Sequence, residues 1–287
     1  MAKNIKAILI VNLLKKNAKL ASDDICKELK KRNVETTVYS FKGKADFAPN
    51  DCFDIAFSMG GDGTVLYTAR MLASFNIPIL PVHLGTLGFL AGIEWHEWLS
   101  VYKDWINQKA KISKRIMLEF SVFRDGKIVY NNSCLNDLVI SAMGKAKLIR
   151  IKTETENNEG EYACLGNYRS DGLIIATPTG STAYSMASGG PILDPEMEAL
   201  IINPICSFSL SSRPMVLPSS QKININVEEN QRSGIILTVD GQDTYELQPK
   251  DRIAVKQSAH CAKLLTKDKF AYCTALKEKL AFGASNA

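Results

Sequence analysis

The sequence predicts an N-terminal α/β domain followed by a mostly antiparallel β domain. From residue 5 to about residue 108, short apolar runs alternate with stretches of helical periodicity. After residue 110, short apolar runs follow one another and are separated by turn residues. A chain of 287 residues is long enough for two domains of ordinary size. We therefore place the α/β domain at 1–110, the β-rich domain at 111–260 and a helical tail, packed back on the α/β domain, at 261–287.

The elements of the first domain follow from its periodicity. Buried strands are expected at 5–11, 34–39, 54–59 and 77–82. Helices are expected at 15–32, 65–74 and 94–108. Strands that alternate with helices imply right-handed crossovers and a Rossmann-like parallel sheet covered on both faces.

The second domain shows hairpins instead. Apolar runs at 118–123 and 127–130 flank Arg124-Asp125-Gly126, a glycine-containing hairpin loop. Further short strands are expected at 135–140, 148–153, 173–177, 223–227, 235–239 and 253–255. Evenly spaced short strands are typical of an antiparallel β domain. The helical pattern returns at 270–280.

Composition narrows the class of protein. Apolar residues make up 46% and charged residues 23%, as in globular proteins. The charge balance of 35 − 30 = +5 contains no dense basic block, so charge alone does not identify a partner. The seven cysteines form no Cys-x-x-Cys pair, which favours a reducing compartment and no structural zinc. No apolar run approaches the roughly 18 residues of a membrane span, so we expect a cytoplasmic protein.

A glycine-rich turn, Gly60-Gly61-Asp62-Gly63-Thr64, lies between an expected strand and an expected helix. Glycines let the main chain approach a phosphate closely, and the helix start offers free N–H groups. Asp62 would repel phosphate, so we expect it to hold a metal, accept a proton or bind a sugar hydroxyl. The turn therefore suggests phosphoryl transfer.

A second polar segment extends from Arg169 to Pro191. Six hydroxyl side chains fall between Thr177 and Ser185, around one proline and one glycine. Hydroxyls, backbone amides and a tyrosine ring together suit a nucleoside.

In combination, these two segments resemble the NAD kinase family. Further matches occur in family order at Leu87-Gly88-Phe89-Leu90, Asn136-Asp137, 210–218 and Val239-Asp240-Gly241-Gln242. The glycine motif alone is only moderately specific, because lipid kinases and phosphofructokinases carry close relatives of it. Its combination with the hydroxyl-rich segment is highly specific.

The resemblance implies a fold similar to NAD kinases and diacylglycerol kinases, with the active site between the two domains. It implies phosphorylation of NAD on the 2′-hydroxyl of its adenosine ribose, with Asp62 as the catalytic base. It places the dinucleotide contacts at Asp62, Gly63, Asn136, Asp137, Lys147, Arg169, Asp171, Thr182, Ala183, Tyr184, Ser185, Met186, Ala187 and Gln242.

The same resemblance implies ATP as donor, with polyphosphate left open. Because the sequence offers no dense Arg/Lys clamp for the donor phosphates, we also expect a divalent metal such as Mg²⁺, for which no protein ligand is assigned. NAD and ATP are the expected partners, without nucleic acid or membrane, and the chain is expected to form a homodimer or homotetramer. Two departures from the family pattern are His83, in place of an asparagine, and Ser207-Phe208, in place of Pro-His.

Two other functions stay open. A lipid kinase of the diacylglycerol type could share the glycine motif, but it would not need the segment from Thr179 to Ser185. A non-catalytic NAD(P)-sensing protein could keep the pocket, although an intact Asp62 argues against it.

Overall fold

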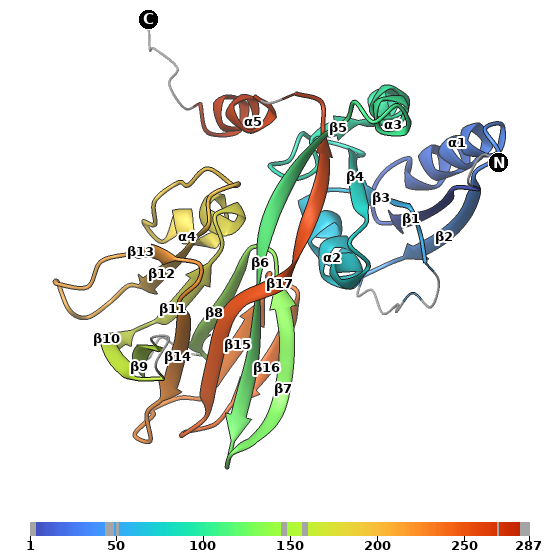
Figure 1. Ribbon diagram of the computed structural model, residues 1–287. Coiled ribbons are helices and arrows are strands. Elements are labelled where there is room, and N and C mark those ends of the chain that lie inside the picture. The colour runs from blue at the N-terminus through green and yellow to red at the C-terminus, as the bar shows by residue number, and fades with distance from the viewer. Residues whose placement is uncertain are drawn as a thin grey trace, which may run out of the picture. The chain divides into compact units, whose positions relative to one another are not determined.

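The computed structural model describes residues 4–43, 49, 52–144, 148–156, 160–268 and 270–281. The chain divides into two compact units, of which unit 1 comprises Met1–Arg115 and His260–Ala287 and unit 2 comprises Ile116–Ala259 (Figure 1). Strands β6 (Lys111–Arg124) and β17 (Arg252–Thr266) each begin in one unit and end in the other. These units are defined by contacts within the structure, and the domain limits expected from the sequence stay a prediction.

Unit 1 alternates strands with helices. Its strands are β1 (Lys6–Asn12), β2 (Glu35–Phe41), β3 (Ile55–Gly60), β4 (Pro78–His83) and the short β5 (Ile93–Glu94). Its helices are α1 (Ala18–Lys30), α2 (Asp62–Leu72), α3 (Trp98–Ile106) and α5 (Ala271–Leu280), with 3₁₀ turns η1 (Ala73–Phe75) and η2 (Trp95–Glu97).

The sheet of unit 1 is parallel. Its strand order is β2-β1-β3-β4, and the end of β17 pairs with β4, also in parallel. The central strand β3 is buried at every position, which explains why Ser58 is its one polar side chain. The helices bury Ile25, Leu29, Trp98 and other apolar residues against Phe57 and the rest of this sheet. The carboxyl ends of β1, β3 and β4 therefore lie at one edge, where ligands of such sheets bind.

Several expected elements differ in extent from the observed ones. The helix expected at 94–108 is divided into η2 and α3, because Glu94 and Glu97 form a capping box that starts the turn. The helix expected from residue 15 begins at Ala18, after Asn17 in a left-handed conformation. Residues 261–266, which the sequence analysis placed in the helical tail, are the last part of β17.

Unit 2 consists mainly of antiparallel strands. They are β7 (Lys127–Cys134), β8 (Asp137–Ala142), β9 (Ile149–Glu156), β10 (Tyr162–Ser170), β11 (Gly172–Ala176), β12 (Ala199–Ile205), β13 (Met215–Pro218), β14 (Lys222–Val227), β15 (Ile235–Val239) and β16 (Asp243–Leu247). Between β11 and β12 lie the 3₁₀ turn η3 (Thr179–Thr182) and the one-turn helix α4 (Tyr184–Ala187).

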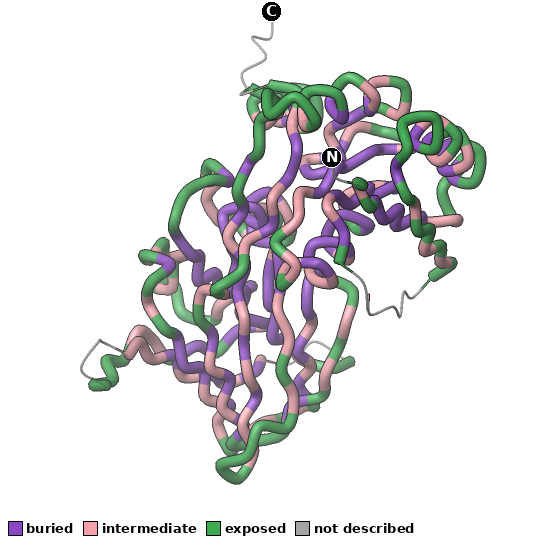
Figure 2. Tube along the Cα trace, turned by 45° about the vertical axis from the view of Figure 1, so that its right-hand side comes forward, coloured by how far each residue is buried: buried purple, intermediate pink, exposed green. Residues whose placement is uncertain are grey.

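Two antiparallel layers enclose the core of unit 2. One has the order β13-β12-β11-β8-β15-β16, and the other contains β10, β9, β14, β17, β6 and β7. Apolar side chains from both layers pack together, among them Phe120, Ile140, Ile175 and Ile225. Figure 2 shows the buried residues concentrated along these strands.

An ion pair anchors the far end of β6. The guanidinium of Arg124 donates from Nε to Asp251 Oδ1 at 2.9 Å and from Nη2 to Oδ2 at 2.8 Å. This hydrogen bonding to a fully buried carboxylate raises the pKa of Arg124. The hairpin thus ends in a charged pair with fixed geometry.

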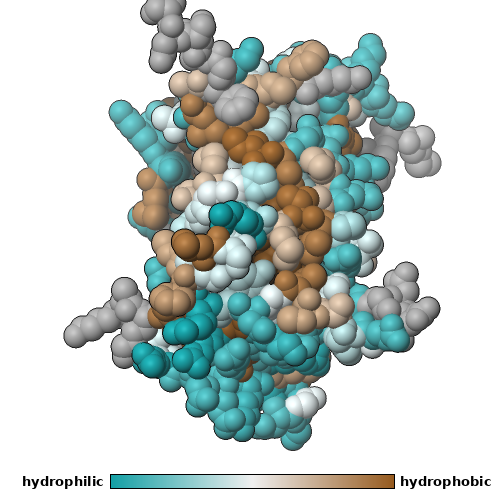
Figure 3. All heavy atoms as spheres, turned by 90° about the vertical axis from the view of Figure 1, so that its left-hand side faces the viewer, coloured by the Kyte–Doolittle hydropathy of each residue, from teal (hydrophilic) through white to brown (hydrophobic). Residues whose placement is uncertain are grey.

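Among the described residues, no helix is long and apolar enough to cross a membrane. Large apolar side chains nevertheless reach the surface of unit 2. Figure 3 shows apolar residues at the surface on the side that faces left in Figure 1. Phe208 is 68% exposed and Leu210 is 89% exposed in the loop between β12 and β13.

Candidate functional site

The glycine-rich turn connects the carboxyl end of β3 to the start of α2. Strand β3 ends at Gly60, Gly61 is the extended N-cap residue, and Asp62 is the first residue of α2. A Cβ on Gly60 would overlap Thr64 Oγ1, so this turn requires the missing side chain. The buried Thr64 Oγ1 has no hydrogen-bond partner among the described residues. The turn is therefore tightly packed on its inner side and presents helix N–H groups at its start.

Backbone donors from a second loop hold the Asp62 carboxylate. Oδ2 accepts the N–H of Phe89 at 2.9 Å, and Oδ1 accepts those of Leu90 at 3.0 Å and Ala91 at 2.9 Å. A Cβ on Gly88 would overlap Asp62 Oδ1, so only glycine lets the loop approach this closely. The carboxylate is thus fixed in direction by three donors, although it belongs to a turn that would otherwise bind anions.

The side chain of Lys15 lies close to the same turn. Lys15 is an exposed residue of the segment that follows β1. A Cβ placed on Gly61 would lie 3.8 Å from Lys15 Nζ. The ammonium group thus faces the main chain of Gly61 without a side chain between them. The sequence analysis did not select Lys15, because its proximity depends on two strands that meet in the sheet.

In unit 2, a pocket of about 370 Å³ opens beside β8. Its lining comprises Asn136, Asp137, Val139, Ser141, Ala183, Tyr184, Thr238, Asp240 and Gly241. The Tyr184 side chain is 48% exposed at this pocket. Asn136 Oδ1 is buried and has no hydrogen-bond partner among the described residues. A buried acceptor without a partner is costly, so a pocket that contains one favours a ligand with a hydrogen-bond donor.

Asp240 holds the wall of this pocket in place. Its Oδ1 accepts the N–H groups of Asn136 at 2.7 Å and Asp137 at 3.2 Å, and its Oδ2 accepts that of Leu135 at 3.1 Å. Asp240 itself has a positive φ of 49°, in the tight turn between β15 and β16. The sequence analysis did not select Asp240 as a site residue, since Asp-Gly in a hairpin is an ordinary turn.

Asp137 titrates in an unusual range for an aspartate. Its side chain is almost fully buried, at 4% exposure. Burial, and secondly the negative charge of Asp240, raise the pKa of Asp137 from 3.8 to about 7. A carboxyl group with a shifted pKa in the wall of a pocket is a candidate functional group.

The hydroxyl-rich segment is mainly a scaffold for the pocket. Thr177 Oγ1 donates to Leu135 O at 2.5 Å and accepts the N–H of Gly180 at 3.1 Å. A Cβ on Gly180 would overlap the backbone of Asn136, so η3 packs directly on the residue that precedes β8. Ser185 is fully buried, and its Oγ accepts a hydrogen bond from Asn203 Nδ2 at 3.2 Å. These hydroxyls fix the backbone that presents Ala183 and Tyr184.

The structure brings together only part of the predicted site. Asn136, Asp137, Ala183 and Tyr184 line the pocket of unit 2. The other predicted residues of unit 2 are not among its lining, namely Arg169, Asp171, Thr182, Ser185, Met186, Ala187 and Gln242. Asp62 and Gly63 belong to unit 1, and Lys147 lies outside the described residues. The assignment of these residues to a ligand stays a prediction.

Phe208, one of the departures from the family pattern, contacts the predicted ligand residue Arg169. Its guanidinium lies over the ring of Phe208, with 5.0 Å between Cζ and the ring centroid. The Phe208 N–H also donates to Arg169 O at 2.8 Å. The aromatic residue that replaces histidine therefore holds the side chain of a predicted ligand contact by a cation–π interaction.

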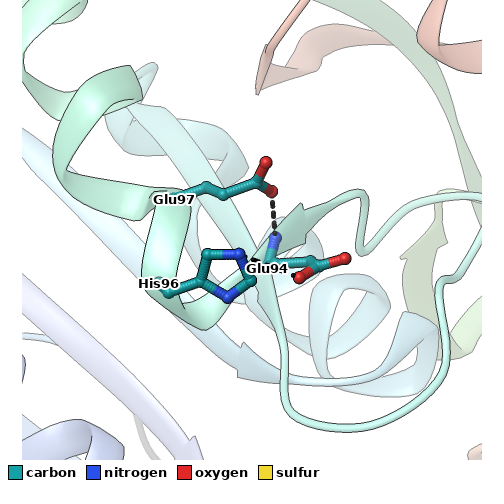
Figure 4. Close-up of side chains that lie close together, drawn as sticks. All are labelled: Glu94, His96 and Glu97. Carbon is teal, nitrogen blue, oxygen red and sulfur yellow. Dashed lines mark hydrogen bonds and ion pairs between the residues drawn. The ribbon is translucent and has the colours of Figure 1, made fainter.

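Three side chains in unit 1 have the composition of a metal site. Glu94, His96 and Glu97 offer ligand atoms within 4.8 Å of one another (Figure 4). Glu97 Oε2 accepts the Glu94 N–H at 3.3 Å, and His96 Nε2 lies 3.2 Å from Glu94 Oε2. Glu97 also pairs with Lys267. Helix capping and ion pairing account for the arrangement of these three side chains.

Another concavity of about 600 Å³ lies in unit 2 and is polar. Four of its charged groups form two ion pairs, since Lys256 pairs with Glu119 at 2.9 Å and Lys222 with Glu156 at 3.2 Å. The ring of Phe123 covers the Arg252 guanidinium at 4.1 Å from its centroid. Arg252 also donates to Asn224 Oδ1 at 2.8 Å, and its positive charge is the one in this lining that no ion pair with a described residue offsets.

Family models and curated relatives match most of the chain. Residues 8–110 match the family described as the ATP-NAD kinase N-terminal domain, and residues 135–266 match the ATP-NAD kinase C-terminal domain. The NAD kinase of Treponema denticola is 39% identical over 282 residues, covering 98% of both chains. The NAD kinase of Geobacter sulfurreducens is 37% identical over 244 residues, covering 84% of both chains.

Solved structures show the same fold. Yeast NADH kinase in complex with NADH is similar with a TM-score of 0.86 and 26% identity, covering 100% of this chain and 90% of that one. An NAD kinase from Archaeoglobus fulgidus in complex with ATP has a TM-score of 0.72 and 22% identity, covering 97% of this chain and 100% of that one. The family matches span most of the chain and both of its units, and the chain belongs to the NAD kinase family, whose members phosphorylate NAD to NADP.

Proposed function

We propose that the pocket of unit 2 binds the adenosine part of NAD and that Asp62 accepts the proton of its ribose 2′-hydroxyl. The observation that carries this proposal is the support of the Asp62 carboxylate by the N–H groups of Phe89, Leu90 and Ala91. A carboxylate offers about four lone-pair positions, of which these donors fill three. The remaining position, on Oδ2, is free to receive a proton from a hydroxyl group.

This support matters because a ribose hydroxyl is a weak nucleophile that must be deprotonated as it attacks. A positioned general base typically contributes about 10²–10⁴-fold to the rate. Three backbone donors fix the direction of Asp62 before the substrate binds, so little reorganisation is needed during the reaction. The chain thus supplies a base with fixed geometry.

The pocket of unit 2 fits the acceptor. Asn136 Oδ1 is a buried acceptor that an adenine amino group or a hydroxyl can satisfy. Asp137 would accept hydrogen bonds from ribose hydroxyls, and the exposed ring of Tyr184 offers a stacking surface for the base. The reduced dinucleotide of the yeast relative suggests NADH as an alternative acceptor to be measured beside NAD.

The glycine-rich turn fits the phosphates of the donor. The N–H groups at the start of α2 would bind them, with the Lys15 ammonium above Gly61 to offset their charge. We propose ATP as the donor and treat inorganic polyphosphate as the alternative. The two donors share the phosphate chain that this turn would bind and differ in the nucleoside.

The Asp62 carboxylate does not fit the role of a metal ligand at this turn. Asp62 already receives three N–H groups, whose positive ends would repel a cation bound to the same oxygens. A divalent metal such as Mg²⁺, when bound, would offset phosphate charge in the donor and would be held mainly by the phosphates and water. The protein then binds and orients the donor–metal complex through backbone groups.

We also propose where the protein is located in the cell and how it assembles. The free cysteines support a cytoplasmic protein. A homodimer or homotetramer is supported by the exposed Phe208 and Leu210, since apolar side chains of this size are usually covered. Light scattering of the purified protein, with Leu210→Ser as a variant, would measure its assembly.

Replacement of Asp62 tests the proposed chemistry. In Asp62→Asn, the side-chain carbonyl can still accept the N–H groups of Leu90 and Ala91, but its amide cannot accept a proton or the Phe89 N–H. We expect NAD binding by calorimetry within about threefold of wild type and kcat lower by about 10²-fold or more. Asp24→Asn, at an exposed position of α1, is the matched control and should keep its activity. Near-normal turnover of Asp62→Asn would refute the assignment.

A further inference from the structure

The residue that orients Asp62 is also the residue that the C-terminal helix contacts. Phe89 donates its N–H to Asp62 Oδ2 at 2.9 Å. Its ring lies 6.5 Å from the ring of Tyr272, centroid to centroid, and 5.4 Å from Lys279 Nζ. Main chain and side chain of Phe89 therefore connect α5 to the Asp62 carboxylate within unit 1.

These contacts come from one face of α5. Tyr272 and Lys279 are seven residues apart, so they project from the same side of the helix two turns from each other. Ala275, between them, is the buried residue of this helix, at 4% exposure. A helix of 10 residues is marginal by itself in water, so α5 depends on the surface against which this face packs.

The loop at residues 87–92, which precedes β5, lies beside a cavity. A cavity of about 230 Å³ is lined by this loop, by the end of β17 and by α5. Its lining includes Leu87, Gly88, Leu264, Tyr272 and Ala275. A loop beside a cavity has fewer atoms to hold it than a loop in a close-packed core, so each remaining contact carries more of its order.

We propose that α5 is a positioning element for the reaction, in which Tyr272 and Lys279 clamp Phe89 and thereby hold the loop N–H groups that orient Asp62. The proposal rests on the catalytic role proposed for Asp62. The close approach of Gly88 to Asp62 Oδ1 leaves no space for the loop to move toward the carboxylate. Loss of the clamp therefore lets the loop move away, and Asp62 loses donors.

Such a displacement affects turnover more than substrate binding. The acceptor pocket lies in unit 2, whereas α5, the loop and Asp62 all belong to unit 1. A base displaced by about 1 Å costs up to about 10²-fold in rate. We expect Tyr272→Leu to lower kcat about 10-fold, to change KM for NAD less than about twofold, and to be rescued by Tyr272→Phe, which keeps the ring.

The experiment compares Tyr272→Leu, Tyr272→Phe and Lys279→Met in the full chain, with Lys277→Met as the control. Lys277 is an exposed lysine of the same helix for which no contact with Phe89 is seen. Hydrogen–deuterium exchange of the peptide that contains residues 89–91 measures the order of the Asp62 donors directly. We expect faster exchange there in Tyr272→Leu and Lys279→Met, and wild-type exchange in Tyr272→Phe and Lys277→Met.

Two results would overturn the proposal. One is wild-type kcat and wild-type exchange at residues 89–91 in Tyr272→Leu. The other is an equal loss of kcat in Tyr272→Phe and Tyr272→Leu, which would assign the effect to the hydroxyl. Failure of the proposed function is distinguishable, because active Asp62→Asn would refute that role while the exchange measurement would still report whether α5 orders the loop.

Discussion

The buried carboxyl group of Asp137 lies beside Asp240, and the two acids have different environments. Asp240 accepts the N–H groups of Leu135, Asn136 and Asp137, which stabilise its charge. Burial and the charge of Asp240 raise the pKa of Asp137 to about 7. One acid thus builds the pocket wall, while the other changes its charge near neutral pH.

Stability should therefore depend on the ionisation of Asp137. Because its folded pKa of about 7 exceeds its ordinary value of 3.8, the folded state binds this proton more tightly. The resulting stabilisation is fully present below 3.8 and is lost as the pH rises through about 7, with a slope of at most about 1.4 kcal/mol per pH unit. Asp137→Asn cannot ionise, so its stability relative to wild type should increase over this range.

Urea unfolding of both proteins at several pH values measures this difference. All three tryptophans, at 95, 98 and 105, belong to unit 1, so their fluorescence does not report on unit 2, and unfolding is followed by circular dichroism of the whole chain. A difference in stability that does not change with pH would contradict the assigned pKa.

NAD affinity should change over the same pH range in the opposite direction from stability. If the ribose hydroxyls donate to Asp137, the ionised form binds better, and Kd for NAD falls as the pH rises toward about 7. The change can reach about tenfold per pH unit below the pKa. Calorimetric titration of wild type and Asp137→Asn checks this, and the variant should lose the dependence. Tighter binding at lower pH would show that the protonated acid donates to the ligand.

Much of this fold follows from local sequence pattern, whereas the site depends on contacts between distant segments. The glycine motif identified Asp62, and the apolar run before it predicted β3. The role of Asp240 could not be predicted, because its bonds reach backbone groups 103 to 105 residues away. An Asp-Gly pair in a hairpin carries no local sign of that role.

The sequence predicted that the hydroxyl-rich segment binds the ligand, but in the structure some of its side chains are exposed and others are buried. Tyr184 is exposed at the pocket, but Ser185 is fully buried and bonded to Asn203. Residues that fix a binding loop and residues that contact a ligand are of the same amino-acid types, so the sequence alone does not distinguish them. Only the direction of each side chain separates them, and that depends on the packing of η3 and α4 on the sheet.

Asp240 should be important for the stability of unit 2. Asp240→Ala leaves the N–H groups of Leu135, Asn136 and Asp137 without their acceptor. Loss of these buried hydrogen bonds to a charged carboxylate should lower the free energy of unfolding by about 3 kcal/mol. Unfolding followed by circular dichroism measures the loss, and the exposed Asp194→Ala is the control within the same unit. A loss below about 0.5 kcal/mol would mean that water replaces the carboxylate.

Lys15 should determine the affinity for the phosphoryl donor. Its ammonium faces the main chain of Gly61, at the start of the helix that would bind donor phosphates. Lys15→Met removes the charge and keeps the length of the side chain, so KM for ATP should rise about 10-fold while KM for NAD stays within about twofold. Lys16→Met, at the exposed neighbouring position, is the control for a general loss of positive charge. Steady-state assays of NADP formation with ATP and with polyphosphate then test whether Lys15 recognises the phosphate chain. A rise in KM for both donors supports this role, and an unchanged KM for ATP in Lys15→Met excludes it.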